Sequence, residues 1–180
     1  MTGRLIGVVG PSGVGKDTLM RALSEASPDL APVRRVITRA PELGGEDYEA
    51  VSEEVFERRR REGAFCVHWR AHGLRYGIPE LVRLRVGKGE ELLVNLSRNV
   101  LSDVAAVFSR FTVLNMTASP ETLAERLAGR GRETVDEIRL RLSRATQPFP
   151  HGPHVVTISN DGPLEDAVEQ ALAMLHPVRA

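Results

Sequence analysis

A glycine-rich stretch near the start of the chain, Gly-Pro-Ser-Gly-Val-Gly-Lys-Asp-Thr over residues 10–18, has the residue types and spacing that bind phosphate. Glycines let the backbone wrap closely around an anion, so that successive N–H groups converge on it. A helix that begins there directs its positive end to the same point, and the ammonium group of Lys16 can reach the outer phosphates of a nucleoside triphosphate. We expect these residues to form the nucleotide site: Gly10, Ser12, Gly13, Val14, Gly15, Lys16, Asp17 and Thr18.

The segments on either side of this stretch fit the same interpretation. Residues 5–9 form a short apolar run that suits a strand buried on both faces. Residues 18–26 carry apolar side chains at helical spacing. A P-loop requires a strand before it and a helix after it, so the context favours a P-loop over a simple glycine-rich turn.

The residue after Lys16 departs from the usual P-loop pattern. That position is ordinarily Ser or Thr, whose hydroxyl ligates magnesium, but here it is Asp17. A carboxylate is a strong magnesium ligand, directly or through water. The alternative is an acidic residue that only interacts favourably with the helix dipole. We expect Asp17 to contribute to a Mg²⁺ site.

Several classes of P-loop protein do not fit the rest of the sequence. No Asn-Lys-x-Asp motif is present to recognise guanine in the manner of a GTPase. The apolar run at residues 92–97 includes Asn95 but no acidic residue, where a motor or transporter ATPase would carry one. A phosphotransferase that acts on a small molecule remains.

Composition excludes other kinds of partner. The 180 residues include 24 Lys and Arg against 24 Asp and Glu, so a general nucleic-acid binder is not expected. Only Lys16 and Lys88 are lysines, which reflects either genomic base composition or a use of arginine forks for phosphate. The only cysteine, Cys66, permits no intrachain disulfide. No segment reaches the length of a membrane span or signal-peptide core, which predicts a cytoplasmic protein without a membrane partner.

Strand and helix patterns alternate along the chain. Such alternation predicts an α/β domain, with helices covering both faces of a mostly parallel sheet. No linker or internal repeat divides the sequence, so we expect a single domain over residues 1–180. The expected strands are residues 5–9, 33–38, 65–69, 74–78, 91–96, 111–116 and 154–158, and the expected helices are residues 18–26, 52–62, 79–86, 99–108, 119–128, 134–146 and 164–175.

From Gly10 to about Ala167 the chain resembles the guanylate kinase family in an ordered series of motifs. The series continues from the P-loop through Thr38-Arg39-Ala40-Pro41, Gly45-Glu46, Tyr48, Gly63-Ala64-Phe65, Trp69, Tyr76-Gly77, the segment Arg126 to Gly131, Arg141-Leu142, Val156 and Asn160-Asp161. The resemblance implies a three-layer P-loop nucleoside-monophosphate-kinase-like fold with a central five-stranded sheet. It also implies a small acceptor-binding subdomain at about residues 34–90 and an arginine-rich lid at about residues 126–145.

By the same resemblance, Arg39, Tyr48 and Tyr76 hold the phosphate of the acceptor. Lys16, Arg130 and Arg141 are the catalytic cations, the two arginines clamping the transferred phosphoryl group. Phosphoryl transfer depends on positioning and on cations at the equatorial oxygens, which arginine forks supply. An acceptor that is already an ionised phosphate needs no general base.

The departures from the family pattern concern recognition of the base. Glu42 replaces a second arginine of the acceptor loop, and Arg35 and His68 stand where the family reads guanine with a hydroxyl and a carboxylate. Guanine offers N–H donors, and a site without acceptors for them should reject it strongly. GMP is therefore not the expected acceptor.

Cations at these positions suit an acceptor with a second phosphate. The pattern, including Gly-Lys-Asp at residues 15–17 and Ala-His-Gly-Leu-Arg-Tyr-Gly-Ile-Pro at residues 71–79, is similar to the ribose 1,5-bisphosphate phosphokinases. That resemblance implies Mg²⁺- and ATP-dependent formation of 5-phosphoribosyl 1-diphosphate in phosphonate breakdown. Candidates for holding the distal phosphate are Arg35, His68, His72 and Arg75. The alternatives are a guanylate kinase with altered base contacts and an inactive guanylate-kinase-like binding module.

The remaining chemical groups receive structural interpretations. The arginines at residues 58–61 lie on a predicted helix among acids, which favours an ion-paired solvent face. His68 and His72 have no further His or Cys at ligand spacing, so a transition-metal site is not expected. Cys66 is expected to pack in the core. Glu46 and Asp47 either contact ribose hydroxyls or brace Arg39, and the oligomeric expectation is a monomer or a homodimer.

Overall fold

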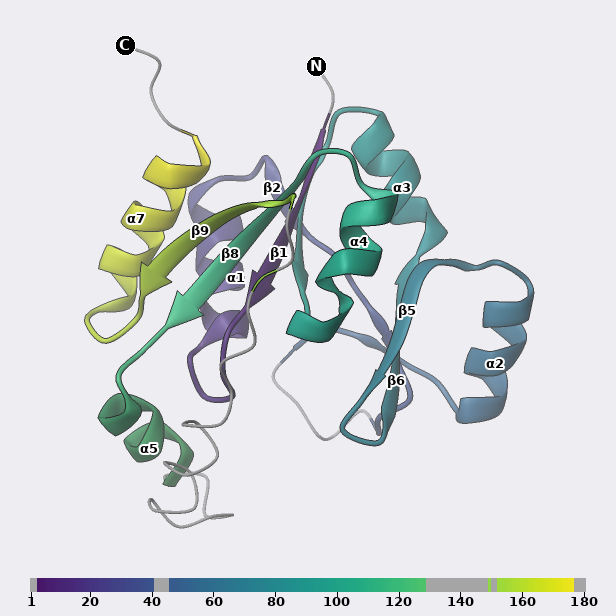
Figure 1. Cartoon of the computed structure of the whole chain (residues 1–180), viewed down its shortest axis with the longest axis horizontal. Helices are drawn as coiled ribbons and strands as arrows, with labels where there is room; N and C mark the ends of the chain where they lie inside the picture. Colours follow the sequence, from purple (N-terminus) through teal and green to yellow (C-terminus); the bar gives the residue numbers. More distant parts are fainter. Residues whose placement is uncertain (1–2, 41–45, 129–148, 150–151, 177–180) are drawn as a thin grey trace.

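Five parallel strands form the centre of the fold in the computed structural model, which describes residues 3–40, 46–128, 149 and 152–176 (Figure 1). Their spatial order is β2-β7-β1-β8-β9, and every neighbouring pair is parallel. The strands are β1 (Arg4–Val9), β2 (Leu30–Pro32), β7 (Glu91–Asn95), β8 (Phe111–Thr117) and β9 (His154–Ser159). The expected α/β class and five-stranded sheet are confirmed.

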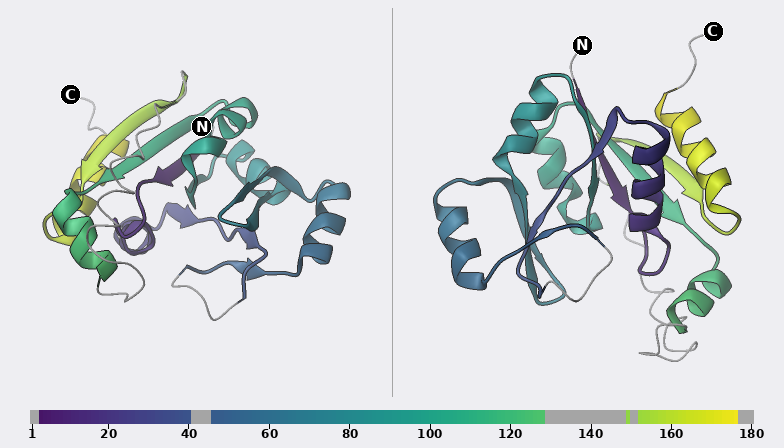
Figure 2. Two further views of the ribbon diagram at one scale, coloured as in Figure 1. Left: turned by 60° about the horizontal axis from the view of Figure 1, so that its bottom comes forward. Right: turned by 180° about the vertical axis from the view of Figure 1, so that it is seen from behind.

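Helices cover both faces of this sheet, because its strands are apolar on both sides. In β1, Ile6 and Val8 point to the face packed by α1 (Lys16–Ala26) and α7 (Leu164–Leu175). Leu5 and Val9 point to the opposite face, which packs against the short helix η1 (Arg98–Val100) and α4 (Leu101–Val107). Figure 2 shows α1 and α7 together in front of the sheet when the molecule is seen from behind.

A second, smaller sheet lies to one side of the first and has the order β4-β3-β6-β5 (Figure 1). The helix α2 (Glu53–Arg61) packs on it through stacked rings of Phe56 and Phe65, whose centroids are 4.7 Å apart. Its strands are β3 (Val36–Ile37), β4 (Glu49–Ala50), β5 (Phe65–Ala71) and β6 (Leu74–Pro79), and α3 (Glu80–Gly87) leads back to the central sheet.

The single strand expected at residues 33–38 is wrong. The chain instead forms β2 in the central sheet and β3 in the small sheet, and the Val33 N–H donates the last bond to the central sheet, to the Leu93 carbonyl at 2.7 Å. The next two side chains, Arg34 and Arg35, pair with carboxylates beside the small sheet. Arg34 and Arg35 interrupt the apolar pattern at the point where the chain passes from the central sheet to the small one.

The other expected elements within the described residues are present, with small shifts at their ends. Ser52 caps α2 by accepting a hydrogen bond from the Val55 N–H at 3.2 Å, and Ser119 accepts one from Thr122 at the start of α5 (Pro120–Ala128). The expected helix at residues 99–108 is divided into η1 and α4. The expected helix at residues 134–146 lies outside the described residues. In the described part of the chain, no helix combines the length and apolar character of a membrane span.

Candidate active site

The candidate site lies at the carboxyl edge of the central sheet, where the P-loop leaves β1. In the sheet register, Val8 is the neighbour of Asn95 on β7, and Val9 is the neighbour of Asn115 on β8. Open α/β sheets bind ligands at this edge because the strand ends and their loops form a crevice there. The two asparagines are therefore brought next to the P-loop from strands distant in sequence.

The P-loop backbone has the left-handed conformations that its glycines make possible. Gly13 and Gly15 have φ angles of 84° and 95°. A Cβ atom on Gly15 would also lie 2.9 Å from the Asn160 side-chain nitrogen. A side chain at Gly15 is thus opposed by both backbone strain and a close neighbour.

Two side chains from other elements hold the loop from behind. The Asn160 Nδ2 donates to the Val14 carbonyl at 2.7 Å, and Asn160 is itself buried. Arg126 of α5 donates to the same carbonyl at 3.4 Å and to the Asn160 carbonyl at 2.9 Å. These bonds fix the P-loop to α5 and to the residue that follows β9.

Lys16 is folded over the loop that precedes it. Its Nζ donates to the carbonyls of Gly10 and Pro11 at 3.0 and 3.3 Å. Lys16 is also the first residue of α1, with Gly15 at the N-cap, so the ammonium group and the helix N-terminus lie together. Ser12 and Thr18 are exposed beside them. The arrangement fits a chain of phosphate groups.

Asp17 lies on the exposed first turn of α1 and contacts β7. Its Oδ1 accepts a hydrogen bond from the Asn95 Nδ2 at 3.0 Å. Within the described part of the chain, its second oxygen has no hydrogen-bond partner. An exposed carboxylate with one oxygen available, beside a phosphate-binding loop, has the donor chemistry that Mg²⁺ prefers.

Arg39 and Tyr48 form a pair beside the small sheet. The guanidinium carbon of Arg39 lies 4.4 Å from the centre of the Tyr48 ring, and the Tyr48 hydroxyl donates to the Ala40 carbonyl at 2.5 Å. The Arg39 Nε is buried and has no hydrogen-bond partner among the described residues. A buried guanidinium N–H without an acceptor is costly, so this group is suited to receive an anion.

Arg35 and Glu46 form a buried ion pair on the same side of the small sheet. The Glu46 carboxylate accepts two bonds from the guanidinium, at 2.8 and 2.5 Å. The guanidinium also stacks on Tyr76, 5.1 Å from the ring centre, and Tyr76 stacks on Trp69. The sequence-based alternative in which Glu46 and Asp47 brace Arg39 is wrong, because Glu46 pairs with Arg35 and Asp47 pairs with Arg34.

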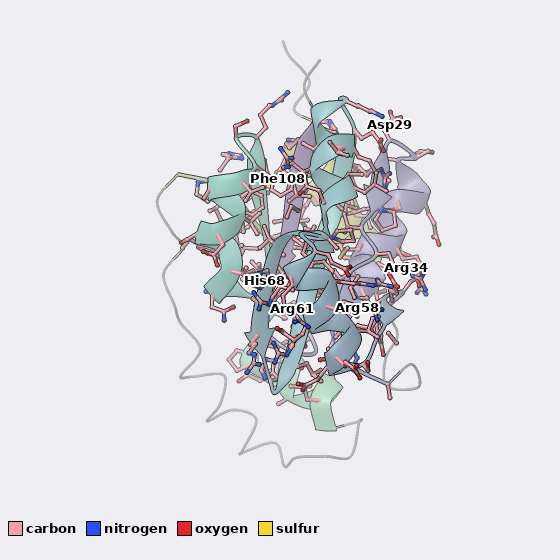
Figure 3. All side chains as sticks on the ribbon, turned by 90° about the vertical axis from the view of Figure 1, so that its right-hand side faces the viewer. Asp29, Arg34, Arg58, Arg61, His68 and Phe108 are labelled. Atoms are coloured by element: carbon pink, nitrogen blue, oxygen red, sulfur yellow. The ribbon has the colours of Figure 1, made fainter. Side chains whose placement is uncertain are left out.

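His68 lies on the opposite face of β5 from Trp69, as strand alternation requires. It is exposed and borders a cavity of about 280 Å³ between α2 and the β5–β6 hairpin, together with Arg75. Figure 3 looks onto this side of the molecule. Arg75 is paired there with Glu57, and His72 is in the hairpin turn with a φ of 51°. The structure therefore does not bring His68 to the cluster that contains Arg35, Tyr48 and Tyr76.

Sequence reasoning assigned no role to a polar chain at the carboxyl edge. Arg98 donates to the Asn115 Oδ1 at 3.0 Å, and the Asn115 Nδ2 donates to Thr157 at 3.2 Å. The Trp69 indole N–H donates to Ser97 at 3.3 Å, which links the small sheet to the central one. The sequence signal for these residues is a polar side chain within a buried apolar strand, as at Asn115 in β8, or just after one, as at Ser97 after β7.

Several residues of the sequence-based hypotheses lie outside the described residues, among them Glu42, Gly45, Arg130 and Arg141. In the described part of the chain, no cluster of three or more His, Cys, Asp or Glu side chains is placed to hold a metal ion. Burial, with a contribution from Glu80, raises the pKa of the Cys66 thiol to about 11, which suits a packing residue.

Comparison with known protein sequences shows the family of this chain. A family model described as an AAA domain matches residues 6–147. The chain is 52% identical over 180 residues to the ribose 1,5-bisphosphate phosphokinase PhnN of Ruegeria sp. (strain TM1040), covering 99% of this chain and 94% of the relative. It is 42% identical over 174 residues to the corresponding protein of Agrobacterium fabrum, covering 95% of each chain.

Solved structures show the same fold at lower sequence identity. A guanylate kinase from Anaplasma phagocytophilum superposes with a TM-score of 0.65 at 20% identity, covering 97% of this chain and 85% of its own. A gluconokinase from Sinorhizobium meliloti superposes with a TM-score of 0.55 at 19% identity, covering 96% of this chain and 91% of its own. With its P-loop, its second small sheet and its near full-length relatives, the chain belongs to the ribose 1,5-bisphosphate phosphokinase family.

Proposed function

We propose that this protein transfers the γ-phosphoryl group of ATP to the 1-phosphate of ribose 1,5-bisphosphate, forming 5-phosphoribosyl 1-diphosphate and ADP. The observation that carries the proposal is the 52% identity to a ribose 1,5-bisphosphate phosphokinase along 99% of the chain. The site geometry agrees with it, because Trp69, which stacks on Tyr76, donates a hydrogen bond to Ser97 just after β7 and so joins the arginine and tyrosine cluster to the carboxyl edge of the central sheet.

On the donor side, Lys16 and the N–H groups of the P-loop bind the phosphates of the nucleotide. The glycine conformations and the bracing of Val14 keep these donors in place before the nucleotide arrives, so little reorganisation is needed. Bound Mg²⁺ would neutralise charge on the phosphate oxygens, and Asp17 is the residue that would hold it. Thr18 and Ser12 lie at the exposed rim, where their hydroxyls can donate to phosphate.

On the acceptor side, Arg39, Tyr48 and Tyr76 hold the phosphate that receives the new bond. The supporting observation is the buried Arg39 Nε, which lacks an acceptor among the described residues. An ionised phosphate oxygen is itself the nucleophile, so no side chain must remove a proton. The work of the site is to align this oxygen with the γ-phosphorus and to stabilise charge on the transferred group.

Arg35 and Glu46 are proposed to recognise the part of the acceptor beyond the reacting phosphate. The ion pair already satisfies the fork of Arg35, so a distal phosphate must either share Arg35 with Glu46 or displace the carboxylate. A displaced Glu46 would be a hydrogen-bond acceptor for ribose hydroxyls. His68, on the other face of β5, remains a candidate only for a ligand that enters from the side of α2.

The remaining assignments extend this proposal. Residues of about 34–90 would act as the acceptor-binding insertion within one domain, and residues of about 126–145 as a lid whose Arg130 and Arg141 reach the transferred group. We expect a monomer or a homodimer that acts in the cytoplasm, where ATP is available.

A panel of acceptors tests the proposed function. With Mg²⁺ and ATP, ADP release should be rapid with ribose 1,5-bisphosphate and slow with GMP, AMP and ribose 5-phosphate. Lys16→Ala should reduce turnover at least a hundredfold, since removal of one preorganised donor costs about 10²–10³ in rate. Preferred turnover of GMP would support the guanylate kinase alternative, and no turnover of any acceptor would support the binding module.

A further inference from the structure

Asp17 and Asn95 carry the reverse of the residue types usual at their positions. P-loop NTPases commonly hold Mg²⁺ with a Ser or Thr at the start of the helix and an Asp on a neighbouring strand. In this chain the helix position carries the carboxylate of Asp17, and the end of the neighbouring strand β7 carries the amide of Asn95.

The structure places these two side chains in direct contact. The Asn95 Nδ2 donates to the Asp17 Oδ1 at 3.0 Å, although the residues are 78 positions apart. Asn95 is fixed by the pairing of β7 with β1, where it is the neighbour of Val8. The rigid sheet therefore supports an amide that holds a carboxylate on the more exposed helix start.

The charge at this contact is the same as in the usual arrangement. One carboxylate accepts a hydrogen bond from one neutral donor, but the two groups have exchanged elements. An Asp at both positions would place two like charges within hydrogen-bond distance, which disfavours ionisation of both. If both side chains were uncharged, no carboxylate would lie beside Lys16 and the helix N-terminus to hold the cation.

We infer that Asn95 is a positioning residue for Asp17, and that this site requires one carboxylate on either α1 or β7, with a neutral donor opposite. The inference rests on the proposed function only for binding of a metal-nucleotide complex, because it does not depend on which acceptor is used. The carboxylate at Asp17 and the absence of an acid on β7 are then two parts of one exchange, in which each change compensates for the other.

Metal binding without an acceptor tests the exchange separately from catalysis. The probe is Mn²⁺ with the non-hydrolysable analogue AMPPNP, and bound Mn²⁺ is measured by electron paramagnetic resonance. Asp17→Ser and the isosteric Asp17→Asn should weaken Mn²⁺ binding about tenfold or more, and Asn95→Leu about tenfold, the scale of losing an outer partner of a metal ligand. Asp17→Ser with Asn95→Asp should restore binding to within about threefold of the wild type, as the relocated carboxylate replaces the lost ligand.

A matched control is available in Asp29, an exposed aspartate that lies just before β2 at the opposite edge of the sheet (Figure 3). Asp29→Asn should leave Mn²⁺ binding unchanged, and a thermal melt establishes that each variant is folded. If Asp17→Ser does not fold, Asp17→Asn combined with Asn95→Asp serves in its place.

Two results would overturn the inference. A double variant that binds Mn²⁺ as weakly as Asp17→Ser would mean that the carboxylate cannot be moved, and unchanged binding by Asn95→Leu would remove its positioning role. Failure of the wild-type enzyme to use ribose 1,5-bisphosphate, together with the expected Mn²⁺ results, would refute the proposed function and leave this inference standing.

Discussion

Two arginines of the acceptor side differ in how their charge is matched. The side chain of Arg35 is 6% exposed, and its guanidinium donates to both oxygens of Glu46. The guanidinium of Arg39 lies over the Tyr48 ring and leaves a buried Nε without an acceptor among the described residues. An incoming phosphate therefore gives the buried Nε of Arg39 a hydrogen-bond acceptor, whereas the guanidinium of Arg35 already has acceptors in Glu46.

The role of Arg35 is testable with acceptors that differ by one phosphate. Arg35→Met should raise the KM for ribose 1,5-bisphosphate about tenfold or more, because a charge-assisted hydrogen bond contributes about 1.5–3 kcal/mol. The KM for ribose 1-phosphate should change less than about twofold, since that acceptor lacks the distal phosphate that Arg35 is proposed to hold. Steady-state kinetics with both acceptors measures the difference.

Arg34→Ala is the matched control, because Arg34 is adjacent in sequence, exposed, and paired with the exposed Asp47. Removing Arg35 alone leaves the Glu46 carboxylate buried without its partner, at a cost of about 3–5 kcal/mol. Adding Glu46→Gln should recover much of this loss in urea unfolding and keep the kinetic comparison interpretable. An equal rise in KM for both acceptors would show that Arg35 does not read the distal phosphate.

Cys66 should be unreactive in the folded protein. Its thiol donates weakly to the carbonyls of Ile78 and Pro79, and burial raises its pKa to about 11. Because the thiolate is the nucleophile, iodoacetamide at pH 8 should label the native protein far more slowly than the protein in urea. Equal labelling rates, followed by mass spectrometry, would contradict this environment.

At the scale of elements, the end of β9 fixes both the P-loop and the start of α5. Asn160 holds the Val14 carbonyl, and the next residue, Asp161, accepts hydrogen bonds from the Ser119 N–H at 2.7 Å and the Ser159 hydroxyl at 2.8 Å. Two consecutive residues thus connect the last strand of the sheet to the nucleotide-binding loop and to the helix that braces it.

The Asp161 contacts predict a dependence of stability on pH. The hydrogen bond from the Ser119 N–H, with those from Ser159 and Thr122, lowers the pKa of Asp161 from 3.8 to about 2. A lowered pKa in the folded state means that the ionised form stabilises the fold above pH 3.8, and that this contribution is lost as pH falls towards 2. Asp161→Asn should therefore lower the melting temperature at pH 6 and have a smaller effect at pH 3.

Thermal melts of both proteins across that range measure the difference. Because Asp161 is exposed, the shift should be modest, and Asp103→Asn, which changes an exposed acid in the first turn of α4, provides a comparison. A difference in melting temperature that stays constant from pH 6 to pH 3 would contradict the role of the ionised carboxylate.

At the scale of the whole molecule, patterns confined to single elements are predictable from the sequence. The buried runs, the caps at Ser52 and Ser119, and the P-loop context follow from local physical chemistry, and they correctly predict an α/β fold. The passage of residues 33–38 from the central sheet to the small one does not follow, because Arg34 and Arg35 there pair with Asp47 and Glu46, which lie 13 and 11 residues further along the chain.

In the site, too, features set by local contacts are predictable from the sequence, and features set by distant contacts are not. Strand alternation predicts that His68 and Trp69 face opposite ways, but only the packed sheets show which face meets the P-loop side. The contact between Asp17 and Asn95 spans 78 residues, so their types could be noted from the sequence while their hydrogen bond could not. The placement of Tyr76 on Arg35 likewise requires the small sheet to be assembled.

The identity of the phosphorylated product tests the central claim most directly. The protein is incubated with Mg²⁺, ATP and equal concentrations of ribose 1,5-bisphosphate and GMP, and the products are followed by phosphorus NMR. We predict that the resonance of the ribose 1-phosphate group is replaced by two coupled diphosphate resonances while the 5-phosphate and GMP signals persist. Conversion of GMP to GDP with unchanged ribose 1,5-bisphosphate would contradict the account.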